Sequence, residues 1–121
     1  MADVLSNKNS VVEKLDLSGN KLGTKEAGIF ARVLLANQNL KSLVLIENKI
    51  GDAGAIELAN VLRQNNTLEL LKVNSNGIGS EGASALSEAL VANDALKDLD
   101  LRFNHIGDDG ATSIAEMLTR N

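Results

Sequence analysis

Hydrophobic positions recur along the chain with a period of 28 residues from Val12 onward. The clearest copy, residues 40–67, reads LKSLVLIENKIGDAGAIELANVLRQNNT, and the other copies begin at positions 12, 68 and 96. Each copy places leucine or valine at its first, fourth and sixth positions and asparagine at its ninth. Fixed spacing at this period is typical of a solenoid, in which each repeat contacts only its neighbours.

The hydrophobic period changes within each repeat. Leu43 and Leu45 alternate with residues of the opposite face, which is the pattern of a short strand with one buried side. From Ala55 to Leu62 the apolar residues lie three and four positions apart, as on one stripe of a helix. One repeat is therefore predicted to be a strand, a turn and a helix.

Polar residues mark the two ends of each predicted helix. The residue after the turn glycine carries a side-chain oxygen in every repeat: Thr24, Asp52, Ser80 and Asp108. Such oxygens accept hydrogen bonds from the unpaired amides that begin a helix, so we predict that each caps its own helix. A second asparagine closes each repeat, at a position where we predict a left-handed helix end: Asn37, Asn65, Asn93 and Asn121.

The repeat resembles the ribonuclease-inhibitor-like class of leucine-rich repeats, on the LxxLxLxxN core, the glycine before the helix and a full helix in every 28 residues. The resemblance covers residues 12–121. The class includes ribonuclease inhibitor, the sensor regions of NOD-like receptors, Ran GTPase-activating protein and the tropomodulins. It implies an α/β solenoid shaped as a horseshoe, with parallel strands on the concave face, helices on the convex face, and proteins bound through the concave face.

The resemblance also implies a structural role for the turn asparagines, which in this class hydrogen-bond the turn backbone along the array. These residues are Asn20, Asn48, Asn76 and Asn104. Backbone groups outside regular ladders need such partners when they are buried. We therefore expect scaffold residues here and no ligand site.

The repeats define one domain with four units, at residues 12–39, 40–67, 68–95 and 96–121. Residues 1–11 imitate the end of a preceding unit and are predicted to form a partial N-terminal turn or cap. The first unit carries Glu26 where the others have Gly54, Gly82 and Gly110. Because the sequence ends with the fourth unit and shows no capping element, we expect either a piece of a longer array or a partner at that edge.

Composition and charge exclude several classes of binding partner and several kinds of site. The net charge of −4 and the pI near 4.9 argue against nucleic acid, whose phosphates require clustered Lys and Arg. The absence of cysteine excludes disulfides and thiolate metal sites. Neither a signal segment nor a run of 18 apolar residues is present, so no membrane partner is predicted and a cytoplasmic protein is expected. By unit the formal charge is +1, 0, −3 and −2, so the acidity lies in the second half.

An apolar cluster is predicted on the strand face that points away from the core. Val44, Ile46 and Leu70 lie there, bordered by charged residues, and an apolar patch rimmed by charge is typical of a protein-binding site. The alternative is that β-branched residues simply suit strands and scatter singly over surfaces. The predicted protein-binding site comprises eight residues: Val44, Ile46, Leu70, Lys72, Asp98, Asp100, Arg102 and Phe103.

Catalytic signals are weak throughout the sequence. His105 is the only histidine and lies in a turn, where a solvated residue is the simpler interpretation. Asp108 and Asp109 fall at the start of a helix, where the helix dipole favours carboxylates without any metal. We therefore predict no catalytic residue, no cofactor and no metal site.

The sequence predicts a non-catalytic protein–protein interaction module that binds a protein partner through its concave face, and that could be a segment of a larger receptor or scaffold. Two alternatives remain open at this point. One is a GTPase-activating or actin-regulatory protein of the same repeat class, although no loop motif here matches the activity of Ran GTPase-activating protein. The other is a structural array that associates with itself through uncapped ends.

Overall fold

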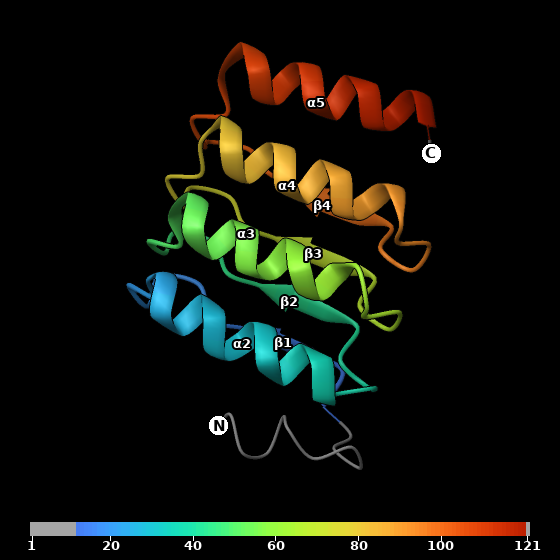
Figure 1. Ribbon diagram of the computed structural model, residues 1–121. Coiled ribbons are helices and arrows are strands. Elements are labelled where there is room, and N and C mark those ends of the chain that lie inside the picture. Colours follow the sequence, from blue (N-terminus) through green and yellow to red (C-terminus); the bar gives the residue numbers. More distant parts are fainter. Residues whose placement is uncertain (1–11, 121) are drawn as a thin grey trace.

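The computed structural model describes residues 12–120 and arranges them as a stack of strand–turn–helix units (Figure 1). The predicted cap at residues 1–11 and the position of Asn121 lie outside the described residues. The strands are β1 (Lys14–Asp16), β2 (Ser42–Val44), β3 (Leu70–Lys72) and β4 (Asp98–Asp100), and the helices are α2 (Thr24–Ala36), α3 (Gly51–Leu62), α4 (Ser80–Val91) and α5 (Gly107–Arg120).

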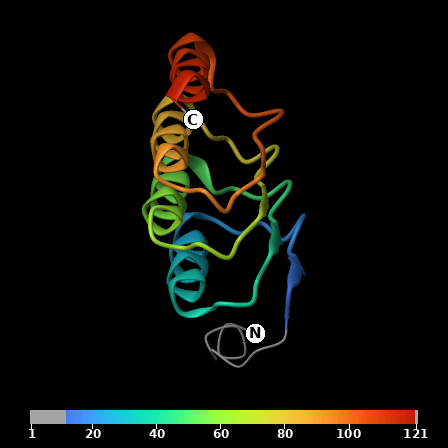
Figure 2. The same cartoon turned by 90° about the vertical axis from the view of Figure 1, so that its right-hand side faces the viewer.

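The strands form one parallel sheet in the order β1-β2-β3-β4, and the helices cover one of its faces (Figure 2). Residues 28 positions apart are paired, so that Leu15, Leu43, Leu71 and Leu99 form one row across the sheet. Parallel strands joined by a helix on one side are what the change of hydrophobic period predicts. The α/β repeat solenoid is confirmed.

The core lies between the sheet and the helices. Leu43 and Leu71 reach it from the strands, Leu58 and Leu86 reach it from the helices, and all four side chains are fully buried. Each helix also approaches the one before it closely. A Cβ atom on Gly82 would lie 2.9 Å from the Cβ of Ala55, which is too close for any side chain to be added without a shift. The recurring glycine and alanine are therefore a packing requirement between successive helices.

The turn asparagines connect successive repeats. The Oδ1 of Asn48 accepts hydrogen bonds from the amides of Asn20 and Leu22, both at 3.0 Å, and its Nδ2 donates to the carbonyls of Leu17 (3.1 Å) and Leu45 (2.9 Å). Asn104 accepts in the same way from the amides of the third turn. Asn48, Asn76 and Asn104 thus each bond to the repeat that precedes them, and their predicted structural role is confirmed.

The predicted N-terminal caps are wrong for α2, α3 and α4, because none of these helices has a side-chain hydrogen bond at its cap residue. Thr24 and Ser80 are the first helical residues, and Asp52 is the second, so their side chains lie inside the first turn. The Oδ1 of Asp52 instead accepts from the amides of Gly79 (2.7 Å) and Gly82 (2.9 Å). This carboxylate therefore caps the helix of the following repeat.

The first repeat replaces that arrangement with a residue of its own. The Oε2 of Glu26 accepts a hydrogen bond of 3.0 Å from the amide of Gly23, just before α2. The amide of Gly79 donates the equivalent bond to Asp52 of the repeat before it. The departure at Glu26 therefore supplies locally the acceptor that the third repeat takes from its neighbour.

The predicted left-handed conformation of the second asparagine is also wrong. Asn37 is extended (φ −89°, ψ 132°), and the non-glycine residues with positive φ lie elsewhere. The role of this asparagine lies in the hydrogen bonds of its side chain. The Oδ1 of Asn65 accepts from the amide of Leu68 at 2.9 Å, and its Nδ2 donates to the carbonyl of Leu34 at 2.8 Å. This asparagine thus ties the loop after its own helix to the end of the preceding helix.

We expect Asn76→Ala to lower the free energy of unfolding by about 2–4 kcal/mol, because it leaves several buried polar groups without partners. Asn76 is 2% exposed, donates to the carbonyls of Leu45 and Asn74, and accepts from the amide of Ile50. Denaturant unfolding monitored by circular dichroism measures the change. The control is Asn60→Ala on the exposed face of α3, which should cost little. Equal losses for the two variants would contradict the role of the asparagine ladder.

Candidate protein-binding face

The sheet face opposite the helices, which we call the outer sheet face, carries the predicted binding residues of the strands. The register places Val44 beside Lys72 and Lys72 beside Asp100, while Leu70 lies beside Asp98. Because Val44 pairs with Lys72, Leu70 is its diagonal neighbour, and such neighbours lie within reach of larger side chains. The structure therefore brings together the strand residues that alternation had assigned to one face.

The apolar part of this face is less exposed than the sequence suggests. Val44, Ile46 and Leu70 are half-buried, because strands about 5 Å apart pack their outward side chains against one another. Phe103, in contrast, is 78% exposed and is the most exposed large hydrophobic residue of the described part of the chain. The outer face thus joins a shielded apolar strip to one protruding aromatic ring.

The backbone of Phe103 is in the left-handed region, with φ at +61°. The equivalent residues Gly19, Glu47 and Ser75 have φ values of 69°, 57° and 56°, so every turn requires this conformation. An L-residue with a Cβ pays about 1–2 kcal/mol for it, which glycine avoids. Neither burial nor backbone preference therefore explains an aromatic residue at this position.

A charged pair lies beside Phe103. Arg102 binds the carboxylate of Asp100 through two atoms, with Nε 2.9 Å from Oδ1 and Nη2 2.7 Å from Oδ2. This bond is the largest reason that the pKa of Asp100 lies well below its usual range, and the same bond raises the pKa of Arg102. The pair therefore stays ionised over the ordinary pH range and forms a fixed charged border to the apolar strip.

Asn74 is a residue of this face that the predicted site omits. It is only 5% exposed, its side chain is hydrogen-bonded to Asp100, and its Oδ1 has no hydrogen-bond partner within residues 12–120. Alternation with Lys72 places it on the outer face, but nothing in the sequence indicates that its neighbours bury it. From the sequence alone, Asn74 is a polar residue at an outward strand position. Such a residue cannot be distinguished from one that is exposed to water.

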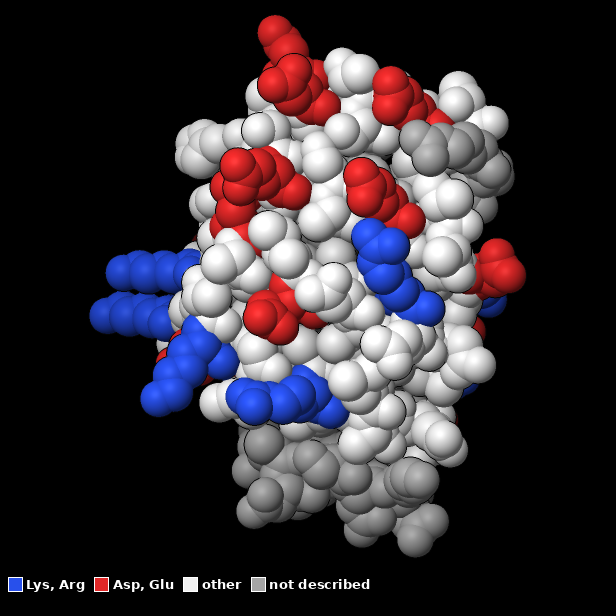
Figure 3. All heavy atoms as spheres, viewed as in Figure 1, with Lys and Arg blue, Asp and Glu red and all other residues white. Residues whose placement is uncertain are grey.

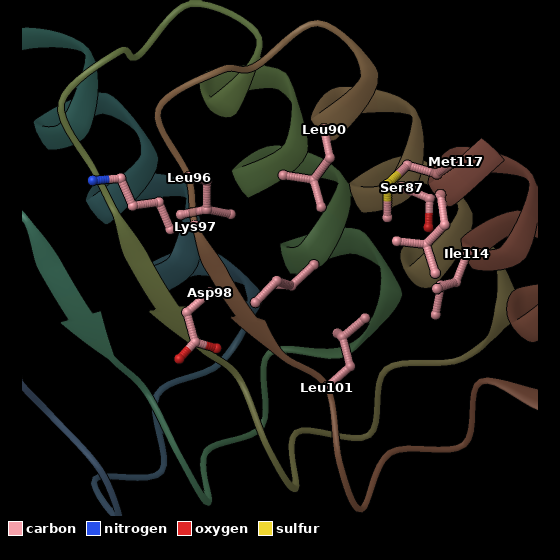
Figure 4. A pocket seen from close by; sticks show the side chains of 10 residues that line it. Ser87, Leu90, Leu96, Lys97, Asp98, Leu101, Ile114 and Met117 are labelled. Atoms are coloured by element: carbon pink, nitrogen blue, oxygen red, sulfur yellow. The ribbon is translucent and has the colours of Figure 1, made fainter. Parts of the chain in front are cut away.

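A groove opens at the C-terminal edge of the stack, between β4 and the helices α4 and α5 (Figure 4). Its volume is about 360 Å³, and Leu101, Met117 and Leu118 contribute to its apolar lining. Asp98, a residue of the predicted binding site on the outer sheet face, also lines the groove.

Charge is distributed unevenly over the helical side of the molecule. Figure 3 shows acidic side chains over α4 and α5, whereas most of the basic side chains lie over α2, α3 and the turns beside them. The order follows the sequence, whose first repeat carries +1 and whose last two carry −3 and −2. The stack therefore has a basic end and an acidic end.

Nothing in the described residues points to a metal or a membrane. Residues 12–120 contain no cluster of three or more His, Cys, Asp or Glu side chains placed to hold a metal ion. His105 is exposed in its turn, and its backbone amide donates to the carbonyl of Ile78. No helix in the described part of the chain is long and apolar enough to cross a membrane.

Comparison with known protein families gives a match to the model described as Leucine Rich repeat, at residues 8–25, 36–59, 64–87 and 93–115. The chain belongs to the leucine-rich repeat family. This membership and the 28-residue unit with its full helix confirm the resemblance to the ribonuclease-inhibitor-like class. A comparison with curated proteins gives no match to the sequence.

Two solved structures share the fold of this leucine-rich repeat chain. One is the leiomodin-1 Actin-Binding Site 2, with a TM-score of 0.90 and 23% identity over 99% of this chain and 71% of that one. The other is the tropomodulin C-terminal domain of Caenorhabditis elegans, with a TM-score of 0.68 and 14% identity over 98% of this chain and 89% of that one. At these identities the likeness establishes the fold.

We expect Arg102→Ala to raise the pKa of Asp100 toward its usual value, because the bond from Arg102 is the main cause of the depression. A carboxyl group whose folded pKa lies below its unfolded value, about 3.9, stabilises the fold above that value. This stabilisation is lost as the pH falls through the folded pKa. The variant should therefore lose less stability on acidification.

An NMR titration of the Asp100 carboxyl carbon, together with denaturant unfolding at neutral and acid pH, measures both effects. Arg63→Ala is the control, since Arg63 pairs with Glu88 at 3.6 Å away from this site. An unchanged Asp100 titration in the Arg102 variant would contradict the assignment.

Proposed function

We propose that the chain is a non-catalytic interaction module that binds a protein partner through the outer face of its sheet. The observation that carries this proposal is Phe103, which is 78% exposed and held at a positive φ. A residue that neither packs nor suits its backbone is better explained by an external contact, because strained residues concentrate at functional sites.

The surroundings of Phe103 fit the anatomy of a protein interface. Aromatic anchors contribute most of the binding energy in such interfaces, and the residues around them exclude water. The strip of Val44, Ile46 and Leu70 offers further apolar area, and the Arg102–Asp100 pair supplies a charged border. This combination of an apolar centre and a polar rim is common in non-obligate complexes.

Actin is the partner that we propose to test first. The leiomodin-1 domain that shares this fold is named as an actin-binding site, and the second similar structure is a tropomodulin domain. A cytoplasmic location follows from the same proposal, because actin is a cytoplasmic protein. The identities of 23% and 14% leave the contact residues on this chain to be found by experiment.

We expect the double variant Ile46→Asp, Leu70→Asp to weaken binding of monomeric actin at least about tenfold, because it places charge in the apolar centre of the interface. Biolayer interferometry with immobilised chain measures the affinity, and circular dichroism checks that the fold is retained. Leu35→Asp is the matched control, since Leu35 is 49% exposed on α2.

Two results would count against the proposal in different ways. If the intact chain does not bind actin, the actin assignment is wrong, and the same three proteins are then used to capture partners from a cell lysate. If the double variant retains every protein that the intact chain retains, the outer sheet face is not the binding site.

We expect Phe103→Gly to separate binding from stability. Glycine suits the left-handed conformation, so the free energy of unfolding should rise by up to about 1 kcal/mol. The affinity for the partner should fall about tenfold or more through loss of the anchor. Unfolding curves and the same binding measurement provide the two values. An affinity equal to that of the intact chain would remove Phe103 from the site.

A further inference from the structure

Three lysines gather where the turns of the first two repeats lead into their helices. Lys21 and Lys49 occupy the same position of successive turns, and Lys25 is the second residue of α2. The amide of Lys49 donates to the carbonyl of Leu22 at 2.8 Å, so the two turns lie directly against each other. All three lysines are exposed, and none forms an ion pair with a carboxylate within residues 12–120. We call this group the lysine cluster.

The backbone of Lys21 is in the left-handed region, with φ at +56°. The equivalent residue of the third repeat is Gly77, with φ at +69°, and glycine adopts this conformation without the steric cost that a Cβ brings. Lys21 is exposed, so burial of its side chain does not offset that cost. Neither backbone preference nor packing therefore explains a lysine at this position, and strained residues concentrate at functional sites.

Lys25 is unfavourably placed with respect to its helix. The N-terminal end of a helix carries a partial positive charge, which favours acidic residues in the first turn and disfavours lysine. The helices α4 and α5 follow this rule, because Glu81 and Asp109 occupy the position equivalent to Lys25. Among the helices that the structure describes, only α2 has a basic residue in its first turn. Lys25 therefore adds to the positive charge at the start of α2, while Glu26 of the same turn is engaged with the amide of Gly23.

The lysine cluster also brings like charges together. Lys21 and Lys49 belong to neighbouring turns, and Figure 3 shows basic side chains that protrude together beside the N-terminal ends of α2 and α3. Like charges at such positions repel each other, and their repulsion opposes folding. Glu47, two residues before Lys49, is exposed and forms no ion pair with it. Three features that are each unfavourable for the fold thus coincide at one place on the surface.

We propose that the lysine cluster binds a short acidic segment of a protein partner. Carboxylates placed there would pair with the three ammonium groups and face the positive ends of α2 and α3, so each unfavourable feature becomes an attraction in the complex. The segment is short because the lysine cluster spans only two adjacent turns. The three lysines are not among the predicted binding residues of the outer sheet face, so the proposal does not depend on the partner or the contacts proposed there.

The charges along the same edge favour a protein segment over a membrane or a nucleic acid. Glu81 and Asp109, at the positions equivalent to Lys25 in the third and fourth repeats, are both exposed. A membrane or a nucleic acid presents negative charge over a wide area and would meet these carboxylates as well as the lysines. A short segment can place its carboxylates against the first two repeats alone. It is therefore attracted by the lysines without being repelled by the later repeats.

The probe for a test is a synthetic hexaglutamate peptide, with hexaglutamine as the uncharged control of the same length. An NMR titration of the isotopically labelled full-length chain at low ionic strength follows the backbone amides and gives the Kd. We expect saturable shifts at Lys21, Lys25 and Lys49 with hexaglutamate only. The cluster variant Lys21→Gln, Lys25→Gln, Lys49→Gln should raise the Kd about tenfold or more, because three weak ion pairs are lost together.

The matched control variant is Lys41→Gln, Arg63→Gln, Lys97→Gln, which removes the same net charge. These three residues are exposed and lie in the loops between a helix end and the next strand, away from the turns that carry the lysine cluster. Its Kd should change less than about twofold, because solvent and salt screen distant charges. The cluster variant should also unfold at no lower denaturant concentration than the intact chain, since the lysines that it removes do not stabilise the fold.

The outcomes separate the proposal from its alternatives. Binding of hexaglutamate that is lost in the cluster variant and retained in the control variant supports it. An absence of saturable shifts, an equal loss in the two variants, or a lower unfolding midpoint of the cluster variant overturns it. The titration is repeated with inorganic phosphate and with phosphatidylserine vesicles at the same concentration of negative charge. If either perturbs the three lysines as strongly as hexaglutamate does, the lysine cluster serves a phosphate group or a membrane, and the proposal is wrong.

Discussion

The hydrogen bonds that cross from one repeat to the next are the constraint on which the whole structure depends. The turns contain backbone amides that are not part of any helix or strand, and leaving such groups unpaired costs about 1–3 kcal/mol each. Asn48 and Asn104 supply acceptors to the turns before them, and Asp52 supplies one to the helix after it. No repeat is therefore complete alone, and the order of a turn depends on residues 26 to 31 positions away.

The fold was largely predictable because it follows from the regular spacing of the hydrophobic residues. A 28-residue period with a change from two-residue to helical alternation specifies strands, helices and their register together, as the pairing of Leu15, Leu43 and Leu71 shows. The polar contacts were less predictable, since spacing identifies a residue near a helix start but not the helix that its side chain faces. Asp52 was assigned to its own helix and binds the next one, because the stacking brings Gly79 closer to it.

The outer sheet face also combines features that the sequence predicts with features that it does not. Alternation correctly assigned Val44, Leu70 and Asp100 to one face, since strand geometry alone decides direction. Their exposure could not be predicted in this way, because it depends on the sizes of side chains on the neighbouring strands. The burial of Asn74 and the positive φ of Phe103 could not be predicted from the neighbouring residues in the sequence either. Both arise from the surrounding turn and strands.

The one-dimensional stacking also gives the gradual change of charge along the sequence a physical meaning. In a fold that returns on itself, residues of the first and last quarters would mix, and their charges would largely cancel at a distance. Here sequence order is preserved as spatial order, so a basic start and an acidic finish produce an electric dipole moment along the long axis (Figure 3). A charged partner that comes within a Debye length, about 10 Å in 0.1 M salt, exerts a torque on such a molecule and turns it before any contact forms. Association should therefore be faster, and its rate more sensitive to ionic strength, than the small net charge alone would suggest.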